Sequence, residues 1–303
     1  MKRYLVSVLC STLLLMGPIA TALHGQNPAA RAQRNDAGAN ITPANYVDED
    51  NRLLWAPMPR WIPTAKRVRV YFAGQVVADS THVHILRDAP VPVYYFPESD
   101  VKSGLFVPSK QVRNAPTRGD ASFWSIKAGD RIAEDAVWTY RTPIEGSEFL
   151  KGYVAFEWNK MDAWFEEMDQ VFVHPRDPFL RIDTVSTDRH VKVVLNGQTV
   201  AESGRAVMLF EPGQPIRYYL PIADTRVELL RPSDTTSRCP YKGLANYYSV
   251  DVGGRVFKDV VWSYRAPTLE SGKIAGMVAF YNEQVDAIFV GGEEVPKPGS
   301  RRR

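Results

Sequence analysis

The chain has 303 residues, of which 45% are hydrophobic and 23% charged, so it is long enough for two ordinary domains and does not have the composition of a disordered protein. Its formal net charge of +3 is too small to indicate a nucleic-acid-binding protein, which usually carries a concentrated basic face. We therefore predict no nucleic-acid partner.

Residues 1–22 have the layout of a secretory signal peptide. Met1–Arg3 is basic, an apolar run extends to Leu23, and Ala20–Ala22 offers small residues for cleavage. We predict export, either after cleavage or with this segment as an uncleaved membrane anchor, which is then the only predicted membrane contact. The alternative is a cytoplasmic protein with a mis-assigned start codon. It is favoured by Cys239, the single cysteine left after cleavage, because exported proteins usually pair their cysteines.

Short runs of aromatic and β-branched residues predict a mainly β protein. Val68–Phe72, Val191–Leu195 and Val256–Tyr264 have the pattern of strands, and twenty-two prolines and twenty glycines punctuate such runs. Long helical periodicity is missing from the sequence. Asn196–Gly197 predicts a tight hairpin, because both residues tolerate positive φ.

The chain contains one unit twice. Val137–Pro143 returns 124 residues later as Val261–Pro267, and several other pairs keep this offset, which becomes 123 further upstream. We predict tandem domains at residues 65–173 and 188–293, joined by a linker at 174–187. Short connections favour antiparallel pairing, so each domain should be a compact antiparallel sheet or small barrel with short helical turns.

The segments outside the two repeats carry few signals of structure. Residues 23–64 are rich in alanine, asparagine, glutamine, aspartate and arginine and show no hydrophobic periodicity, so we predict a disordered linker. Residues 294–303 end in three arginines and are predicted to be a basic tail.

One short motif distinguishes the two repeats. The second repeat contains Cys239-Pro-Tyr-Lys-Gly243, where the first has Ala115-Pro-Thr-Arg-Gly119. A glycine in both copies indicates a backbone turn, whereas the cysteine and the tyrosine are absent from the first copy. We therefore predict that any active pocket lies in the second repeat and that the first is a scaffold or a regulatory domain.

Cys239 and Lys242 are candidate catalytic residues, with Glu211 as the general base. A lysine three residues after a cysteine favours the reactive thiolate, and the same lysine is a candidate for binding an anion or forming a Schiff base. A buried apolar thiol and a salt-bridged lysine are the structural alternatives. Asp224 is a further acid–base candidate. The first repeat has an aspartate at the positions of both carboxylates, so a shared structural bond is an equal alternative.

Aromatic side chains of the second repeat are candidates for lining a ligand pocket together with Lys242. Alternating aromatic residues on strands also form cores, and the recurrence of the tryptophan and tyrosine of Val-Trp-x-Tyr in both repeats favours a core role for that pair. The candidates are Tyr219, Tyr241, Tyr247, Tyr248, Trp262 and Tyr264.

The sequence predicts no metal site and no cofactor. His82 and His84 lie on one face of a predicted strand, but a metal site needs three or four ligands and the five histidines do not cluster at matching positions of the two repeats.

Several runs of the second repeat carry a resemblance to a known family: Val200–Ser203, Arg217–Pro221, Leu230–Thr235, Cys239–Gly243, Trp262–Tyr264 and Val278–Tyr281. With these runs, the repeat resembles a bacterial and fungal family of unknown function, numbered 427, that often occurs as tandem pairs and is labelled nucleotidyltransferase family 9. The resemblance extends from Val68 to Val290 and implies a mostly β fold without an established activity. Neither repeat has a Gly-Ser followed by an Asp-x-Asp pair to hold metal beside phosphate, so the motifs do not support the label.

Three functions follow from these observations. The first is binding of a small polar or anionic molecule, of unidentified structure, by the second repeat. The second is catalysis through Cys239 and Lys242, and the third is a scaffolding or interaction role for both repeats.

Overall fold

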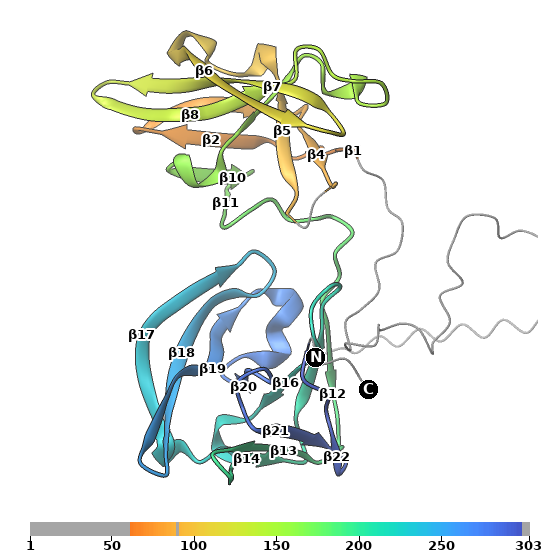
Figure 1. The fold of residues 1–303 in the computed structure, drawn as a ribbon, viewed down its shortest axis with the longest axis vertical. Coiled ribbons are helices and arrows are strands. Elements are labelled where there is room, and N and C mark those ends of the chain that lie inside the picture. The colour runs from red at the N-terminus through yellow and green to blue at the C-terminus, as the bar shows by residue number, and fades with distance from the viewer. Residues whose placement is uncertain (1–60, 89–90, 299–303) are drawn as a thin grey trace, which may run out of the picture. The chain divides into compact units, whose positions relative to one another are not determined.

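The computed structural model describes residues 61–88 and 91–298 (Figure 1). The predicted signal segment, nearly all of the predicted N-terminal linker and half of the predicted basic tail lie outside these residues. In the part of the chain that is described, no helix has both the length and the apolar character needed to cross a bilayer.

The structure confirms a mainly β protein with two similar halves, each made of two antiparallel sheets. In the first half, the seven-stranded sheet has the order β1 (Trp61–Pro63), β4 (His84–Leu86), β5 (Val93–Pro97), β9 (Tyr153–Phe156), β8 (Arg131–Thr139), β7 (Gly119–Ala128) and β6 (Phe106–Ala115). Its four-stranded sheet has the order β11 (Asp169–Val171), β10 (Ala163–Glu166), β2 (Val68–Phe72) and β3 (Gln75–Ser80).

The second half repeats this topology strand for strand. Its seven-stranded sheet has the order β12 (Asp183–Ser186), β15 (Val207–Phe210), β16 (Arg217–Leu220), β20 (Val278–Phe280), β19 (Arg255–Pro267), β18 (Gly243–Val252) and β17 (Leu230–Cys239). Its four-stranded sheet has the order β14 (Gln198–Ser203), β13 (Val191–Leu195), β21 (Ala287–Val290) and β22 (Glu293–Glu294). The helices of the described residues are short 3₁₀ turns, such as η3 (Glu98–Asp100), η4 (Ser103–Leu105) and η7 (Ile222–Asp224).

The two sheets of each half enclose one hydrophobic core. The buried side of β2 carries Val68 and Val70, and these pack in one cluster with Tyr94 and Phe96 of β5. The alternation of buried and half-buried side chains along β2 is the period of two that its sequence predicts. The matching cluster of the second half joins β13 to β16 and β19 in the same way.

Two short strands occur where the sequence predicted linkers. Trp61–Pro63 forms β1 and pairs with β4, and Asp183–Ser186 forms β12 and pairs with β15. Three or four residues without hydrophobic alternation give no strand signal of their own, because the pairing partner and not the local sequence holds them extended.

The turns follow the predicted chemistry. Asn196 and Gly197 have φ of 51° and 71° and connect β13 to β14 as a two-residue hairpin. Gly243 has φ of 100°, and an added Cβ would lie 3.2 Å from the carbonyl oxygen of Ala266. Gly119 has nearly the same conformation in the first repeat, so the glycine of the shared motif is required by the backbone, as predicted.

The seven-stranded sheet of each half has a second face, on the side away from the four-stranded sheet. In the second half this outer face carries a separate aromatic cluster that contains Tyr219, Trp262 and Tyr264, each no more than 6% exposed. The strands that supply these residues are β16 and β19. The outer face is where most of the predicted site residues lie.

Candidate functional site

A buried acid–base pair marks one side of the outer face. Glu211 directly follows β15, Lys242 lies in the turn between β17 and β18, and the two form an ion pair. Their side chains are only 11% and 13% exposed. The first repeat has the equivalent pair, Asp88 and Arg118, at 2.6 Å, so the pairing of these positions belongs to the fold that both copies share.

Aromatic residues form the floor beside this pair. The indole Nε1 of Trp262 donates a hydrogen bond of 3.0 Å to the hydroxyl of Tyr219, and burial raises the pKa of Tyr219 well above its usual range. The same bond joins Trp138 to Tyr95 in the first repeat, at 3.3 Å. Burial also raises the pKa of Tyr264. These phenols are therefore neutral hydrogen-bonding groups near neutral pH.

A cavity of about 220 Å³ opens above this floor. Ten side chains were predicted as catalytic or ligand-binding candidates. Seven of them line this one cavity, which brings the cysteine, the lysine and the glutamate together. The seven are Glu211, Tyr219, Cys239, Lys242, Tyr247, Trp262 and Tyr264. Cys239 is half-buried at the cavity wall, which differs from the fully buried apolar thiol of the structural alternative.

The other three candidates, Tyr241, Tyr248 and Asp224, lie elsewhere. The hydroxyl of Tyr241 accepts a 2.7 Å hydrogen bond from the backbone N–H of Asp177, and burial raises its pKa to about 12. Its side chain therefore holds the segment between the repeats. Tyr248 follows Tyr247 on β18, and because successive side chains point to opposite faces of a sheet, Tyr248 packs on the inner core.

The aspartate at the position of Asp224 accepts structural hydrogen bonds in both repeats. It accepts hydrogen bonds from Ser203 at 2.7 Å and from Arg205 at 2.7 Å and 3.0 Å, and these lower its pKa to about 2. In the first repeat, Asp100 accepts a 2.6 Å hydrogen bond from Ser80. This supports the alternative that a structural bond explains the aspartate at this position.

Polar residues that the sequence analysis did not select complete the cavity. Arg217, Ser237 and Tyr281 line it, and the hydroxyl of Tyr247 lies 2.8 Å from that of Ser237 and 3.4 Å from that of Tyr281. Arg217 packs over Trp262 with 5.6 Å between guanidinium and ring centre. It is also held by Glu283 through two hydrogen bonds of 2.8 Å.

The first repeat places a large charged side chain over the corresponding aromatic rings. Arg113 stands at the β6 position that matches Ser237, and its guanidinium lies 5.0 Å from the ring centre of Phe123 and 5.1 Å from that of Trp138. It also pairs with Glu157, at the position that matches Tyr281. Ser237 and Tyr281 could therefore have been selected from the sequence by comparing them with Arg113 and Glu157 at the matching positions of the first repeat.

A family model described as a domain of unknown function (DUF427) matches the chain twice, at residues 60–167 and 183–291. The chain belongs to the DUF427 family. No curated protein matches it. The two matches correspond to the two halves of the structure, so this chain is a tandem DUF427 protein, as the resemblance of the sequence predicted.

The described residues of this DUF427 chain contain no group of three histidine, cysteine, aspartate or glutamate side chains placed to hold a metal ion. His84 instead stacks on Trp61 with 4.6 Å between ring centres.

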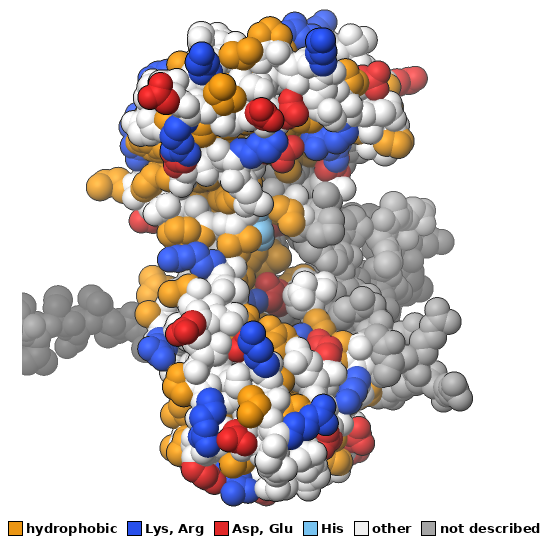
Figure 2. Space-filling model, turned by 60° about the vertical axis from the view of Figure 1, so that its left-hand side comes forward, with side chains coloured by type: hydrophobic (Ala, Val, Ile, Leu, Met, Phe, Trp, Pro, Cys, Tyr) orange, Lys and Arg blue, Asp and Glu red, His pale blue; other side chains and the backbone are white. Residues whose placement is uncertain are grey.

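On the face shown in Figure 2, acidic and basic side chains are interspersed. The predictions on cofactors and partners stay predictions.

The chemistry available in the cavity of the second DUF427 repeat is hydrogen bonding with paired charges. Both cations, Arg217 and Lys242, already have a carboxylate partner, so an anion would have to compete with Glu283 or Glu211. The hydroxyls of Ser237, Tyr247 and Tyr281 can each donate and accept without breaking an ion pair.

Proposed function

We propose that the second repeat binds a small polar molecule in the cavity of the outer face. The observation that carries this proposal is that a cavity of about 220 Å³ lined by three adjacent hydroxyls lies where the first repeat places Arg113 over the matching rings. Ligand pockets combine an apolar floor with a few fixed polar groups, and Trp262, Tyr219 and the hydroxyls supply both.

The ligand that fits this site has neutral hydroxyl or carbonyl groups and one flat apolar side. Its polar groups would exchange hydrogen bonds with Tyr247 and Tyr281. Its flat side would contact the exposed part of the Tyr281 ring, whose other side packs on Trp262 with 4.4 Å between ring centres. An anionic ligand is the other form of the prediction, and it requires Lys242 to leave Glu211 or to bind both at once.

The test uses the full chain labelled with 5-fluorotryptophan. The chain has seven tryptophans, and Trp262 is the one in the second repeat, so its ¹⁹F resonance, assigned through Trp262→Phe, reports on this cavity. Screening a library of neutral and anionic metabolites should reveal at least one compound that shifts this resonance to saturation. Trp138, the residue at the matching position of the first repeat, should not respond.

A matched pair of substitutions separates the cavity from the surface around it. Ser237→Arg places in the second repeat the side chain that lies over the matching rings of the first, and it should abolish the response of Trp262. Thr236→Arg adds the same side chain at the neighbouring exposed position of β17 and should leave the response intact. A compound that binds equally well to both variants would contradict the proposed site, and no response to any compound would favour a scaffolding role.

Thiol catalysis is the second candidate, and it is favoured by one observation. Cys239 lines the same cavity as Lys242 and Glu211, so a nucleophile, a cation and a carboxylate share one space. If this cavity is catalytic, Cys239→Ala should bind the compound found in the screen and fail to convert it. Lys242→Ala should weaken its binding. Unchanged conversion by Cys239→Ala would refute thiol catalysis.

A further inference from the structure

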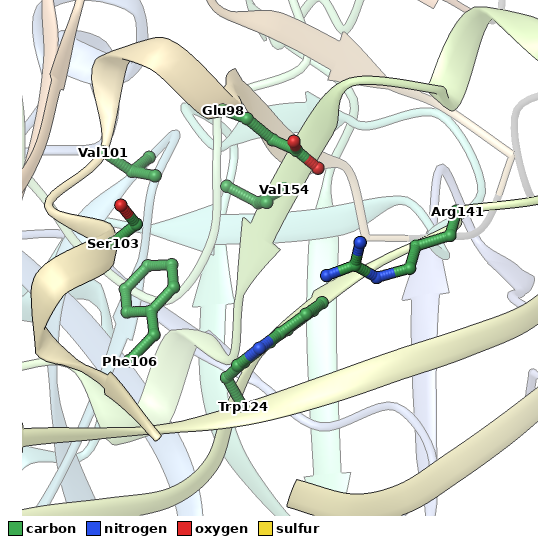
Figure 3. A pocket seen from close by; sticks show the side chains of 7 residues that line it. All are labelled: Glu98, Val101, Ser103, Phe106, Trp124, Arg141 and Val154. Carbon is green, nitrogen blue, oxygen red and sulfur yellow. The ribbon is translucent and has the colours of Figure 1, made fainter. Parts of the chain in front are cut away.

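The first repeat has a cavity of its own, at a different place on the fold. This cavity has a volume of about 250 Å³ and lies between the 3₁₀ turns after β5 and the strands β6, β7 and β9 (Figure 3). Phe106 and Trp124 form its aromatic walls, and the buried Val154 lies at its base. None of its lining residues stands at a position that matches the cavity of the second repeat.

Three solvent-exposed polar residues border this cavity, and their side chains have no hydrogen-bond or ion-pair partner among the described residues. The carboxylate of Glu98, the hydroxyl of Ser103 and the guanidinium of Arg141 form neither hydrogen bonds nor ion pairs there. Figure 3 shows the carboxylate and the guanidinium directed toward the same space from different elements. They are too far apart to form an ion pair with each other, so two opposite charges border one gap.

The guanidinium of Arg141 lies over an aromatic ring. Its guanidinium carbon lies 5.0 Å from the ring centre of Trp124. A guanidinium that stacks on an aromatic face keeps its edge N–H groups free, and these match a carboxylate in two parallel hydrogen bonds. The arrangement therefore offers an oriented donor for a carboxylate beside an apolar wall.

The second repeat lacks this combination. At the matching positions it has Ile222 in place of Glu98 and Val227 in place of Ser103, while Arg265 is retained in place of Arg141. The cation alone is thus common to both copies. The carboxylate and the hydroxyl that would complete a site occur only in the first.

We propose that the first repeat binds a small zwitterion with an apolar group, the chemistry of a free amino acid. Arg141 takes the carboxylate, Glu98 takes the protonated amine, and the apolar group lies against Phe106 and Trp124. The volume is below the roughly 300–1,000 Å³ of sites for drug-sized ligands, which suits a molecule of this size. The first repeat is then a binding domain and not only a scaffold.

The experiment titrates the 5-fluorotryptophan-labelled full chain with three probes. L-Phenylalanine carries both charges, phenethylamine lacks the carboxylate, and 3-phenylpropionate lacks the amine. The resonance of Trp124, assigned through Trp124→Phe, should shift to saturation with L-phenylalanine. The concentration for half-saturation should be at least about tenfold higher with either analogue, because each analogue leaves one charged group of the site unpaired.

Substitutions in the two repeats complete the test. Arg141→Gln and Glu98→Gln should each weaken L-phenylalanine binding about tenfold, whereas Arg265→Gln in the second repeat should leave it unchanged. The proposal is overturned if Trp124 does not respond to L-phenylalanine, if both analogues bind as well, or if neither substitution weakens binding. The reporter here is Trp124 and not Trp262, so the outcome is independent of the function proposed for the second repeat.

Discussion

Replacement of Lys242 by methionine should lower the free energy of unfolding of the second repeat by about 3 kcal/mol. The substitution keeps the length of the side chain and removes its charge, which leaves the carboxylate of Glu211 unpaired. The two side chains are 13% and 11% exposed. Loss of one partner from a buried pair costs about 3–5 kcal/mol, against about 0–1 kcal/mol for an exposed pair. Because some solvent still reaches this pair, we expect the lower end of the buried range.

The double variant distinguishes an unpaired charge from lost packing. Glu211→Gln together with Lys242→Met removes both charges, so it should be about 2 kcal/mol more stable than Lys242→Met alone. In the first repeat, Arg118→Met breaks the matching pair with Asp88, whose side chains are 22% and 14% exposed. It should destabilise that repeat by less, about 2 kcal/mol.

The assay is urea unfolding of the full chain followed by ¹⁹F spectroscopy. The resonance of Trp262 follows the second repeat and that of Trp138 the first, so each repeat has its own midpoint and m-value even where the two unfold separately. The reasoning is refuted if Lys242→Met costs less than about 0.5 kcal/mol, as an exposed pair would. The reasoning is also refuted if the losses of Lys242→Met and Glu211→Gln, measured singly, add up to the loss of the double variant.

Three further predictions concern a turn and two titrating groups. Gly243→Ala should cost about 2 kcal/mol in urea unfolding, because φ is 100° and a carbonyl oxygen lies 3.2 Å from the added Cβ. Gly254→Ala, with φ of 74° and open space, should cost only about 1 kcal/mol, so equal losses would contradict the argument. Burial lowers the pKa of His84 below 6.5, so folding favours its neutral form. Stability should therefore be full above about pH 6.5 and fall below it, and His84→Phe should remove this part of the slope in thermal unfolding. The hydrogen bond from Arg205 lowers the pKa of Asp224 from 3.8 to about 2. Its contribution should thus be present above about pH 4 and lost toward about pH 2, so a stability deficit of Asp224→Asn that stayed constant over this range would refute the assignment.

The repeat and the strands were predictable from the sequence because the repeat keeps a fixed sequence offset and each strand has its own hydrophobic alternation. Val68–Phe72 and Val191–Leu195 are strands with the bounds that their alternation predicted. The division of each repeat into a sheet of seven and a sheet of four strands was not predictable in this way. It depends on pairs distant in the chain, such as β10 with β2, where Trp164 lies opposite Val70. No local propensity specifies such a partner.

Local sequence was likewise not enough to predict which side chains of the candidate site point into the cavity. Cys239 and Lys242 stood out because the first repeat lacks them, and this comparison led to the cavity. Tyr247 and Tyr248 were both selected as aromatic, although the period of two along a strand allows only one of them on the outer face. Arg217 and Ser237 were missed because a polar residue on a strand gives no signal of its own until the face that it occupies is known.

The two repeats share a set of structural contacts and differ in the side chains that line their cavities. Each keeps an acid–base pair at the same positions and a tryptophan that donates to a tyrosine hydroxyl. The tryptophan–tyrosine hydrogen bond is buried in both copies, and the ion pair is buried in the second and partly buried in the first. Loss of one partner from either contact would leave an unpaired group and destabilise the repeat.

The positions that vary lie at the edges of cavities. A substitution there changes the volume and charge of the cavity and leaves the shared ion pair and hydrogen bond intact. Arg113 lies over Trp138 in the first repeat, whereas the smaller Ser237 lines an open cavity in the second. Glu98 gives the first repeat a carboxylate where the second has Ile222. One β fold can thus carry cavities of different chemistry at different places. Duplication of the unit permits this, because each copy retains its own core while its surface positions change.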